Sequence, residues 1–345
     1  MTCPAPSYLS LSARVLVNAE AMNMVEALGN VVRHRKASVV YKTGEGRYEV
    51  RTVPVISGEA VRHAIQAALA DIAAQKGWPV CAWCRRHELV KRGVRALIEN
   101  ADELERLAKE GLAKAEKKIL EGCVVEDVGG FLTPLKAAPV KRTSVLEVGY
   151  MLPVMQDGKI LYGFDVQFHV RHAPSAQTQA GGGEEQPQTI YNIESSSSLY
   201  SLGINVELWR IGVVQGEGDC EQLDDRRGRV EATLAALAAV LNGDVRIGGH
   251  WSSYRPAWSV ESAVAVFSSP MPISAIPAVE QDYEAKTQQL AKDKAEVYKK
   301  VLRSFSYDVL IYRRGCEQEG CVADLGAFVK KLLELGLKYA GHSQR

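Results

Sequence analysis

Residues 53–77 read VPVISGEAVRHAIQAALADIAAQKG, and their pattern predicts an amphipathic helix that starts at Ser57. Ser57 is a favourable N-cap, because its hydroxyl can accept a hydrogen bond from an unpaired backbone N–H of the first turn. Glu59 lies in that turn, where a negative charge stabilises the helix dipole. Gly77 and Pro79 end the helix. Its single apolar face, which needs another layer to cover it, consists of Val61, Ile65, Ala68, Leu69 and Ile72.

Strands are expected on both sides of this helix. The apolar run 11–18 (LSARVLVN) predicts a first strand, and residues 38–53 predict a hairpin around the turn Thr43–Gly46. Strands interleaved with long helices predict an α+β fold, and we expect residues 1–345 to form one domain. Further strands are expected at 124–132, 144–154, 161–171, 189–208, 258–267 and 306–312, and further helices at 225–241, 282–302 and 322–339.

Two excursions are expected from this domain. Residues 85–121 carry charges of alternating sign, which is typical of a solvent-exposed helix, so residues 78–122 are expected to form a helical insertion and not a core element. Residues 172–188 (HAPSAQTQAGGGEEQPQ) hold no large apolar side chain that could order them. This second segment predicts a flexible hairpin loop.

The overall composition is that of an ordinary globular chain. Of 345 residues, 46% are hydrophobic and 24% are charged, and 42 Lys and Arg against 41 Asp and Glu leave a net charge of only +1. This balance argues against a strongly basic nucleic-acid coat. No secretory signal or membrane span is evident, since the uncharged run 262–279 contains three prolines. An odd number of cysteines, seven, without a disulfide framework favours the cytoplasm but leaves a bridge open.

The basic residues are not spread evenly. Between Val31 and His63, seven basic residues face three acidic ones, so this window alone carries +4. The run Arg33-His34-Arg35-Lys36 is expected in a loop, where cationic side chains could neutralise phosphates, although such a run is more often only solvated. The helix start at Ser57 and Gly58 could bind the same ligand, because its free N–H groups attract anions. Arg62 and His63, one turn further on, could reinforce this site.

A second candidate surface is the predicted strand Asp165–Arg171 (DVQFHVR). Side chains of a strand alternate between its two faces, so Val166, Phe168 and Val170 share one face. Gln167, His169 and Arg171 share the other, and such a donor-rich row suits single-stranded RNA. For His169 taken singly, a purely structural role is equally compatible with the sequence.

Catalytic motifs are missing from the sequence. It has no G-x-S-x-G elbow, Walker A run, H-E-x-x-H or complete G-x-G-x-x-G. Cys81 and Cys84, followed by His87, could bind zinc if Cys316 and Cys321 folded back to supply a second pair, or could form a disulfide. Free or buried thiols are the simpler interpretation, so we expect no metal and no cofactor.

Several separated segments, taken in order, resemble the RNA-binding backbone subunit of archaeal type I-A CRISPR Cascade, in the DevR-like branch of the RAMP proteins. The resemblance covers about residues 11–75 and 123–208, which is 151 of 345 residues, and fades beyond Trp209. The segments are NAEAMNMVEALGNVVRHRKASVVYK (18–42), VPVISGEAVRHAIQAALADIA (53–73), EDVGGFLTPLKAAPVKRTSVLEVGYMLP (126–153), QFHVRHAP (167–174) and YNIESSSSLYSL (191–202).

This resemblance implies a modified RRM-like (ferredoxin-like) palm with a helical insertion and a projecting hairpin. It implies a non-catalytic scaffold that polymerises along the CRISPR RNA and presents it to invading DNA. The partners would be guide RNA, target DNA paired with the guide, further copies of the chain and other Cascade subunits. The RNA-binding residues are expected to be Asn18, Arg33, His34, Arg35, Lys36, Ser57, Gly58, Arg62, His63, Lys141, Arg142, Gln167, His169 and Arg171.

An alternative within the same superfamily is an endoribonuclease that processes CRISPR RNA. It would use His169 with His34 or His63 as general acid and base. No tyrosine paired with a histidine is evident from the sequence. A third alternative is a metal-dependent binding module built on Cys81 and Cys84.

Overall fold

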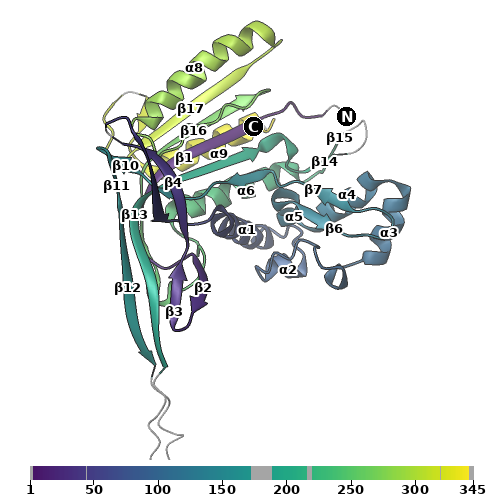
Figure 1. The fold of residues 1–345 in the computed structure, drawn as a ribbon. Helices are drawn as coiled ribbons and strands as arrows, with labels where there is room; N and C mark the ends of the chain where they lie inside the picture. Colours follow the sequence, from purple (N-terminus) through teal and green to yellow (C-terminus); the bar gives the residue numbers. More distant parts are fainter. Residues whose placement is uncertain (1–2, 44, 172–188, 216–219, 319, 342–345) are drawn as a thin grey trace, which may run out of the picture.

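The computed structural model describes residues 3–43, 45–171, 189–215, 220–318 and 320–341. Its centre is a sheet in which β1 (Tyr8–Glu20) lies between β13 (Thr189–Glu207) and β16 (Ala257–Ser269), antiparallel to both (Figure 1). Leu11 of β1 lies opposite Ile204 of β13 and Ala265 of β16. β17 (Ser306–Arg313) and β18 (Cys321–Val322) extend the sheet beyond β16. The predicted strands at 11–18, 189–208, 258–267 and 306–312 are confirmed.

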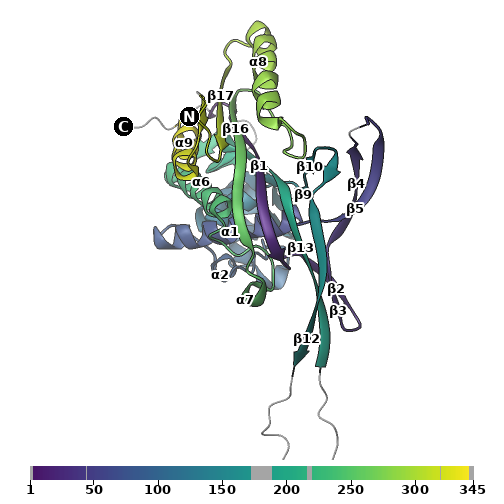
Figure 2. The same ribbon diagram turned by 90° about the vertical axis from the view of Figure 1, so that its left-hand side faces the viewer.

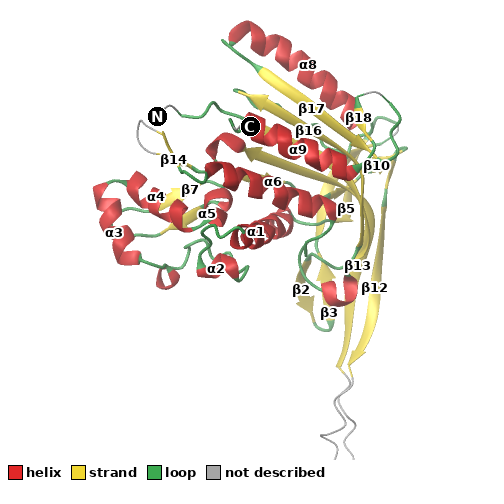
Figure 3. Cartoon of the chain, turned by 180° about the vertical axis from the view of Figure 1, so that it is seen from behind, coloured by secondary structure: helices red, strands yellow, loops and turns green. Residues whose placement is uncertain are grey.

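Three helices cover one face of this sheet, as Figure 3 shows. They are α1 (Gly58–Gln75), α6 (Arg226–Asn242) and α9 (Leu325–Tyr339). Every second side chain of β1 from Leu9 to Val17 is buried and belongs to one core cluster with these helices. Each buried methylene of such a core contributes about 0.8 kcal/mol to stability. The predicted helix after Ser57 is confirmed, including its cap, because the Ser57 side chain accepts a hydrogen bond from the backbone N–H of Ala60 at 3.2 Å.

A second layer packs on the opposite face of the sheet. There α8 (Tyr283–Val301) packs over β16 and β17, and the buried side chains Val264, Val266 and Tyr283 lie in this second layer. Their neighbours Ala263, Ala265 and Phe267 face the main core instead. The strand β16 is therefore buried on both faces over residues 263–267, which explains the apolar run AVAVF at these positions.

The strand β13 connects this body to a long hairpin that projects from it (Figure 2). One half of β13, from Ser196 to Glu207, pairs with β1, while the other half, from Thr189 to Ser198, pairs with β12 (Tyr162–Arg171). Beside the hairpin lie β2 (Met24–Leu28) and β3 (Val31–His34), and β3 pairs with β13 at Asn192 and Ile193. The predicted loop 172–188, at the end of this hairpin, lies outside the described residues.

Shorter strands and turns complete this side of the molecule. β4 (Lys36–Lys42) and β5 (Tyr48–Pro54) form the hairpin that the sequence predicts at 38–53. β8 (Leu146–Val148) and β9 (Leu152–Pro153) pair with β13 on the same edge as β12. The remaining elements here are β10 (Met155–Gln156), β11 (Lys159–Ile160), η3 (Leu208–Arg210) and α7 (Trp251–Tyr254).

The segment from Cys81 to Gly129 is helical and has a small core of its own. It contains α2 (Ala82–Arg85), η1 (Arg95–Leu97), α3 (Ala101–Glu110), α4 (Leu112–Gly122) and α5 (Val124–Gly129). Leu104, Ile119 and Leu120 are buried together in this segment, so the expectation of a purely solvated helix is wrong. The segment also packs against the short pairs β6 (Phe131–Thr133) with β7 (Val140–Arg142) and β14 (Val213–Gln215) with β15 (Cys220–Gln222).

One predicted strand is a helix. Residues 124–132 are rich in β-branched side chains, but Val124, Val125 and Val128 lie in α5 and are buried in the main core. The two acidic residues between them are also buried and are held by arginines, Glu126 by Arg92 and Asp127 by Arg142. These tertiary contacts outweigh the local preference for a strand.

Candidate nucleic-acid interface

The basic segment 31–63 occupies β3, the hairpin β4–β5 and the start of α1. Arg33 and Lys36 do not lie in a loop, as expected, but on two strands that meet at Arg35. The Arg33 side chain is 47% exposed and lies 3.6 Å from the Glu26 carboxylate. Lys36 Nζ lies 3.8 Å from the ring centre of Phe164 and 3.5 Å from Glu194. The Arg33–Glu26 pair is exposed and therefore weak, so a phosphate can replace the Glu26 carboxylate at little cost.

Further exposed cations extend this surface along the β4–β5 hairpin. Lys42, Arg47 and Arg51 are exposed, and their carboxylate partners, Glu45 for Arg47 and Glu49 for Arg51, lie on the same hairpin. Tyr48 and Val50 are also largely exposed there. The hairpin therefore combines mobile positive charge with an uncovered aromatic ring, which together suit a phosphate backbone with unstacked bases.

His34 lies in the interior and does not face this surface, so its prediction as an RNA-binding residue is wrong. Its side chain has no exposed area, and its Nε2 lies 2.5 Å from the buried carboxylate of Glu20. The same carboxylate accepts hydrogen bonds from Ser196 and Tyr200. Strand alternation within β3 explains the error, because Arg33 points outward while the next residue, His34, points in.

Arg142 is the second prediction that the structure contradicts. Its guanidinium has no exposed area and binds Glu116 at 2.8 Å and Asp127 at 2.6 Å. It also donates to three backbone carbonyl oxygens, those of Asp127, Val213 and Arg210. Arg142 thus joins the helical segment to the chain that enters α6. Its neighbour Lys141 is exposed and stays a candidate.

Gly58 has a structural explanation. A Cβ atom at this position would lie 2.1 Å from the carbonyl oxygen of Val148 and 2.9 Å from that of Gly149. The backbone that approaches the start of α1 is therefore the chain's own, and the Ser57 hydroxyl is occupied as the helix cap. Ser57 and Gly58 are both buried, so the expected phosphate site at this helix start is not open.

Arg62 and His63 lie further along α1. His63 lines a cavity of about 580 Å³ together with His87, Asp71 and Arg246. Burial, followed by the nearby charges of His87 and Lys91, lowers the pKa of His63 below its usual value. These surroundings therefore disfavour the charged form of His63. Asn18 is exposed near the end of β1, and Arg35 is partly buried.

The two faces of the β12–β13 hairpin differ as the sequence predicts. On one face, His169 stacks on Tyr191 with ring centres 5.1 Å apart, and its Nε2 lies 2.6 Å from the Tyr254 hydroxyl. Burial, followed by Tyr191, raises the pKa of Tyr254, so this hydroxyl stays protonated, and the histidine tautomer sets which group donates in the hydrogen bond. Gln167 on the same face is exposed. The backbone of Arg171 pairs with Thr189.

The other face of the hairpin is apolar and uncovered. Phe168 is 63% exposed, and Val166, Val170 and Ile190 are 40–50% exposed. The register places Val170 opposite Ile190, so these side chains form one continuous strip. Exposed apolar strips of this kind mark interaction surfaces. The period-2 pattern predicted the grouping of Val166, Phe168 and Val170 but not their exposure.

Sequence reasoning missed two partners that only the fold supplies. Tyr254 lies 85 positions from His169, and Cys123 lies 39 positions from Cys84, so no local spacing pointed to either. Cys316 and Cys321 form a disulfide with one another, as do Cys3 and Cys220. The suggestion that Cys316 and Cys321 complete a zinc site with Cys81 and Cys84 is therefore wrong.

An α+β body with a basic surface, open aromatic rings and a projecting hairpin defines a candidate nucleic-acid-binding protein. Residues 11–288 match the family model described as CRISPR-associated negative auto-regulator DevR/Csa2. The chain belongs to this DevR/Csa2 family. The match confirms the resemblance and extends it well beyond Trp209, where the sequence motifs fade.

Two relatives agree with this assignment. The chain is 36% identical over 282 residues to a CRISPR-associated aCascade subunit Cas7/Csa2 of Saccharolobus solfataricus, which covers 80% of this chain and 84% of the relative. It is 33% identical to a second Cas7/Csa2 protein of that organism, over 78% of this chain and 81% of the relative. A chain of a solved CRISPR RNA-guided surveillance complex matches with a TM-score of 0.47 and 15% identity, over 95% of this chain and all of that one.

Among the helices that the structure describes, none is both long and apolar enough to cross a membrane.

Proposed function

We propose that this chain is the guide RNA-binding backbone subunit of a Cascade complex, acting in the cytoplasm. The observation that carries the proposal is the surface of exposed cations on β3, β4 and β5, in a chain whose family includes an aCascade subunit. The proposed partners are guide RNA, target DNA that pairs with it, further copies of this chain and other Cascade subunits. We further propose that the chain has no catalytic activity of its own.

The proposed palm is RRM-like. The sheet order β16–β1–β13–β8 and the chain order β1, α1, β8, β13, α6, β16 support it, because these are the order and alternation of a βαββαβ unit. The helices α1 and α6 of this unit pack against each other on one face. We expect the projecting hairpin and the helical segment to be additions to this palm.

Charge reversal at Arg33 and Lys36 tests the proposal. The double variant Arg33→Glu, Lys36→Glu should weaken binding of all single-stranded RNAs about equally, by at least tenfold near 0.1 M salt, because it removes phosphate contacts and not base contacts. Fluorescence anisotropy with several unrelated RNAs measures this. The matched control reverses two exposed lysines of α8, Lys292→Glu and Lys299→Glu. Equal losses in both double variants, or a loss for some sequences only, would contradict the proposal.

A second candidate function, RNA cleavage, is favoured by one observation, the contact between His169 Nε2 and the Tyr254 hydroxyl at 2.6 Å. In such a reaction a base takes the proton of an RNA 2′-hydroxyl, whose oxygen attacks the adjacent phosphorus, and an acid protonates the 5′-oxygen that leaves. His34 cannot be the second group, because it is buried against Glu20. Incubation with CRISPR repeat RNA separates the two functions. Site-specific cleavage that His169→Ala abolishes and Tyr254→Phe slows would establish the enzyme and overturn the scaffold proposal.

A further inference from the structure

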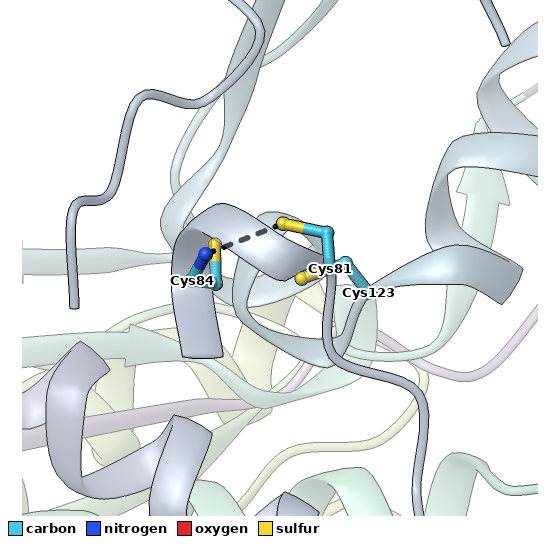
Figure 4. Close-up of side chains that lie close together, drawn as sticks. All are labelled: Cys81, Cys84 and Cys123. Atoms are coloured by element: carbon cyan, nitrogen blue, oxygen red, sulfur yellow. Dashed lines mark hydrogen bonds between the residues drawn. The ribbon is translucent and has the colours of Figure 1, made fainter. Parts of the chain in front are cut away.

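Three cysteines that lie apart in the sequence meet where the helical segment leaves and rejoins the palm. Cys81 caps the short helix α2, Cys84 lies within it, and Cys123 immediately precedes α5. Their sulfur atoms all lie within 4.8 Å of one another, and Figure 4 shows them gathered between α2 and the segment that carries Cys123. Cys84 and Cys123 are fully buried and Cys81 is partly exposed. The other four cysteines form two disulfides, so these three are the free thiols of the chain.

The spacing of the sulfur atoms suits a thiophilic divalent cation. A Zn–S distance of about 2.3 Å and tetrahedral geometry require sulfur atoms roughly 3.8 Å apart, which small side-chain rotations reach from the observed positions. The turn at α2 is already shaped for this, since Cys81 Sγ accepts a hydrogen bond from the backbone N–H of Cys84 at 3.5 Å. Such a bond stabilises a thiolate, which is the form that binds metal.

Charged neighbours compensate for the thiolates. Three thiolates and a divalent cation together carry one negative charge, which is costly to bury without a partner. Arg92 and Lys91 lie on the loop that follows α2 and act electrostatically on Cys81 and Cys84, respectively. Arg92 also binds the buried carboxylate of Glu126, one turn after Cys123. His87, which follows Cys84 in the sequence, instead binds Asp71 and lies outside the cluster.

We propose that Cys81, Cys84 and Cys123 form a structural site for one zinc ion, with a water molecule in the fourth position. The site would fix the base of the helical segment, because Cys81 and Cys84 lie at its start, at α2, and Cys123 lies after α4, just before α5. Beside the cluster, the Val124 N–H donates a hydrogen bond to the Pro79 carbonyl oxygen at 2.9 Å. This bond already joins the segment before α2 to the start of α5. The ion would therefore hold α2, α3 and α4 in a fixed orientation relative to α1.

Metal analysis of the full-length protein tests this site. Protein purified under reducing conditions without chelator, from cells grown with added zinc, should contain about one zinc per chain by mass spectrometry of the metal. Cys123→Ser should reduce the zinc content at least tenfold, whereas Cys316→Ser, which removes a cysteine outside the cluster, should leave it unchanged. Reconstitution of metal-free protein with Co²⁺ should give the near-ultraviolet absorption band of thiolate-to-cobalt charge transfer.

Thermal unfolding keeps the test decisive if Cys123→Ser folds poorly. A strong chelator should lower the thermal unfolding temperature of the wild-type protein by several degrees, and added zinc should restore this temperature. The proposal is overturned if the wild-type protein contains no zinc and shows no charge-transfer band with Co²⁺. It is equally overturned if Cys316→Ser loses as much zinc as Cys123→Ser, or if peptide mapping finds a disulfide within the cluster of the reduced protein.

Discussion

Neighbouring residues of the basic run 33–36 differ in their position, since some are exposed and one is buried. Arg33 and Lys36 point to solvent, while His34 between them is buried against Glu20, Ser196 and Tyr200. The contact between His34 and Glu20 lies where β1, β3 and β13 meet, so it fixes the base of the projecting hairpin. A buried ionisable pair is costly to break, because removal of one partner leaves the other without compensation.

We expect His34→Ala to destabilise the protein without a direct effect on RNA contacts. The Glu20 carboxylate would lose its closest partner in the interior, at a cost of about 3 kcal/mol. Urea unfolding measures this cost, and His63→Ala, on the partly exposed part of α1, is the matched control with little effect expected. If His34→Ala left stability unchanged but lowered RNA affinity, the interior assignment of His34 would be wrong.

Local sequence patterns could predict the main strands and helices but not the ionic contacts inside the protein. Long strands and helices follow from local periodicity, so the strands β1, β4, β5, β12, β13, β16 and β17 and the helices α1, α6, α8 and α9 were predictable. The interior ionic contacts of His34 and Arg142 were not, because their partners Glu20, Glu116 and Asp127 come from other elements. An arginine or histidine next to exposed basic residues carries no local sign that it is buried.

Among the elements, the β12–β13 hairpin carries the most unusual surface. Most hairpins turn their apolar face to the core, but here Phe168, Val166, Val170 and Ile190 are uncovered. The hairpin remains ordered because β13 continues into the central sheet and β3 pairs beside it. Aromatic side chains on such a surface can stack on unpaired bases.

Phe168→Ala should therefore reduce RNA affinity while leaving the fold intact. Loss of one stacked base costs about 1–3 kcal/mol, which corresponds to roughly tenfold or more in the dissociation constant. Val297→Ala on α8 removes a similarly exposed apolar side chain and is the control, with no change expected. Anisotropy and thermal melting together decide this. A lower melting temperature with unchanged affinity would instead assign Phe168 a packing role.

At the scale of the whole molecule, positive charge is concentrated in one region, residues 31–63. The net charge of +1 conceals the +4 of residues 31–63, and the structure places most of those cations on exposed strands. A chain of this kind can hold RNA along one surface and remain near neutral elsewhere, which favours association with further copies.

Assembly on RNA should therefore increase stepwise with RNA length. If copies bind side by side along a guide, longer single-stranded RNAs should yield discrete larger complexes by mass photometry, with equal mass increments. Because binding depends on phosphate contacts, the complexes should dissociate as salt rises from about 50 to 200 mM. A single protein-to-RNA ratio for all lengths would contradict assembly along the guide.

The continuity of β13 limits how the projecting hairpin can change in length. A strand of 19 residues spans roughly 60 Å, and its side chains alternate between two faces along the whole distance. Insertion of one residue in the hairpin would exchange the apolar strip of Phe168 with the face of His169, whereas matched insertions of two residues in β12 and in β13 would preserve both. Related chains should therefore differ in the length of this hairpin by an even number of residues in each strand.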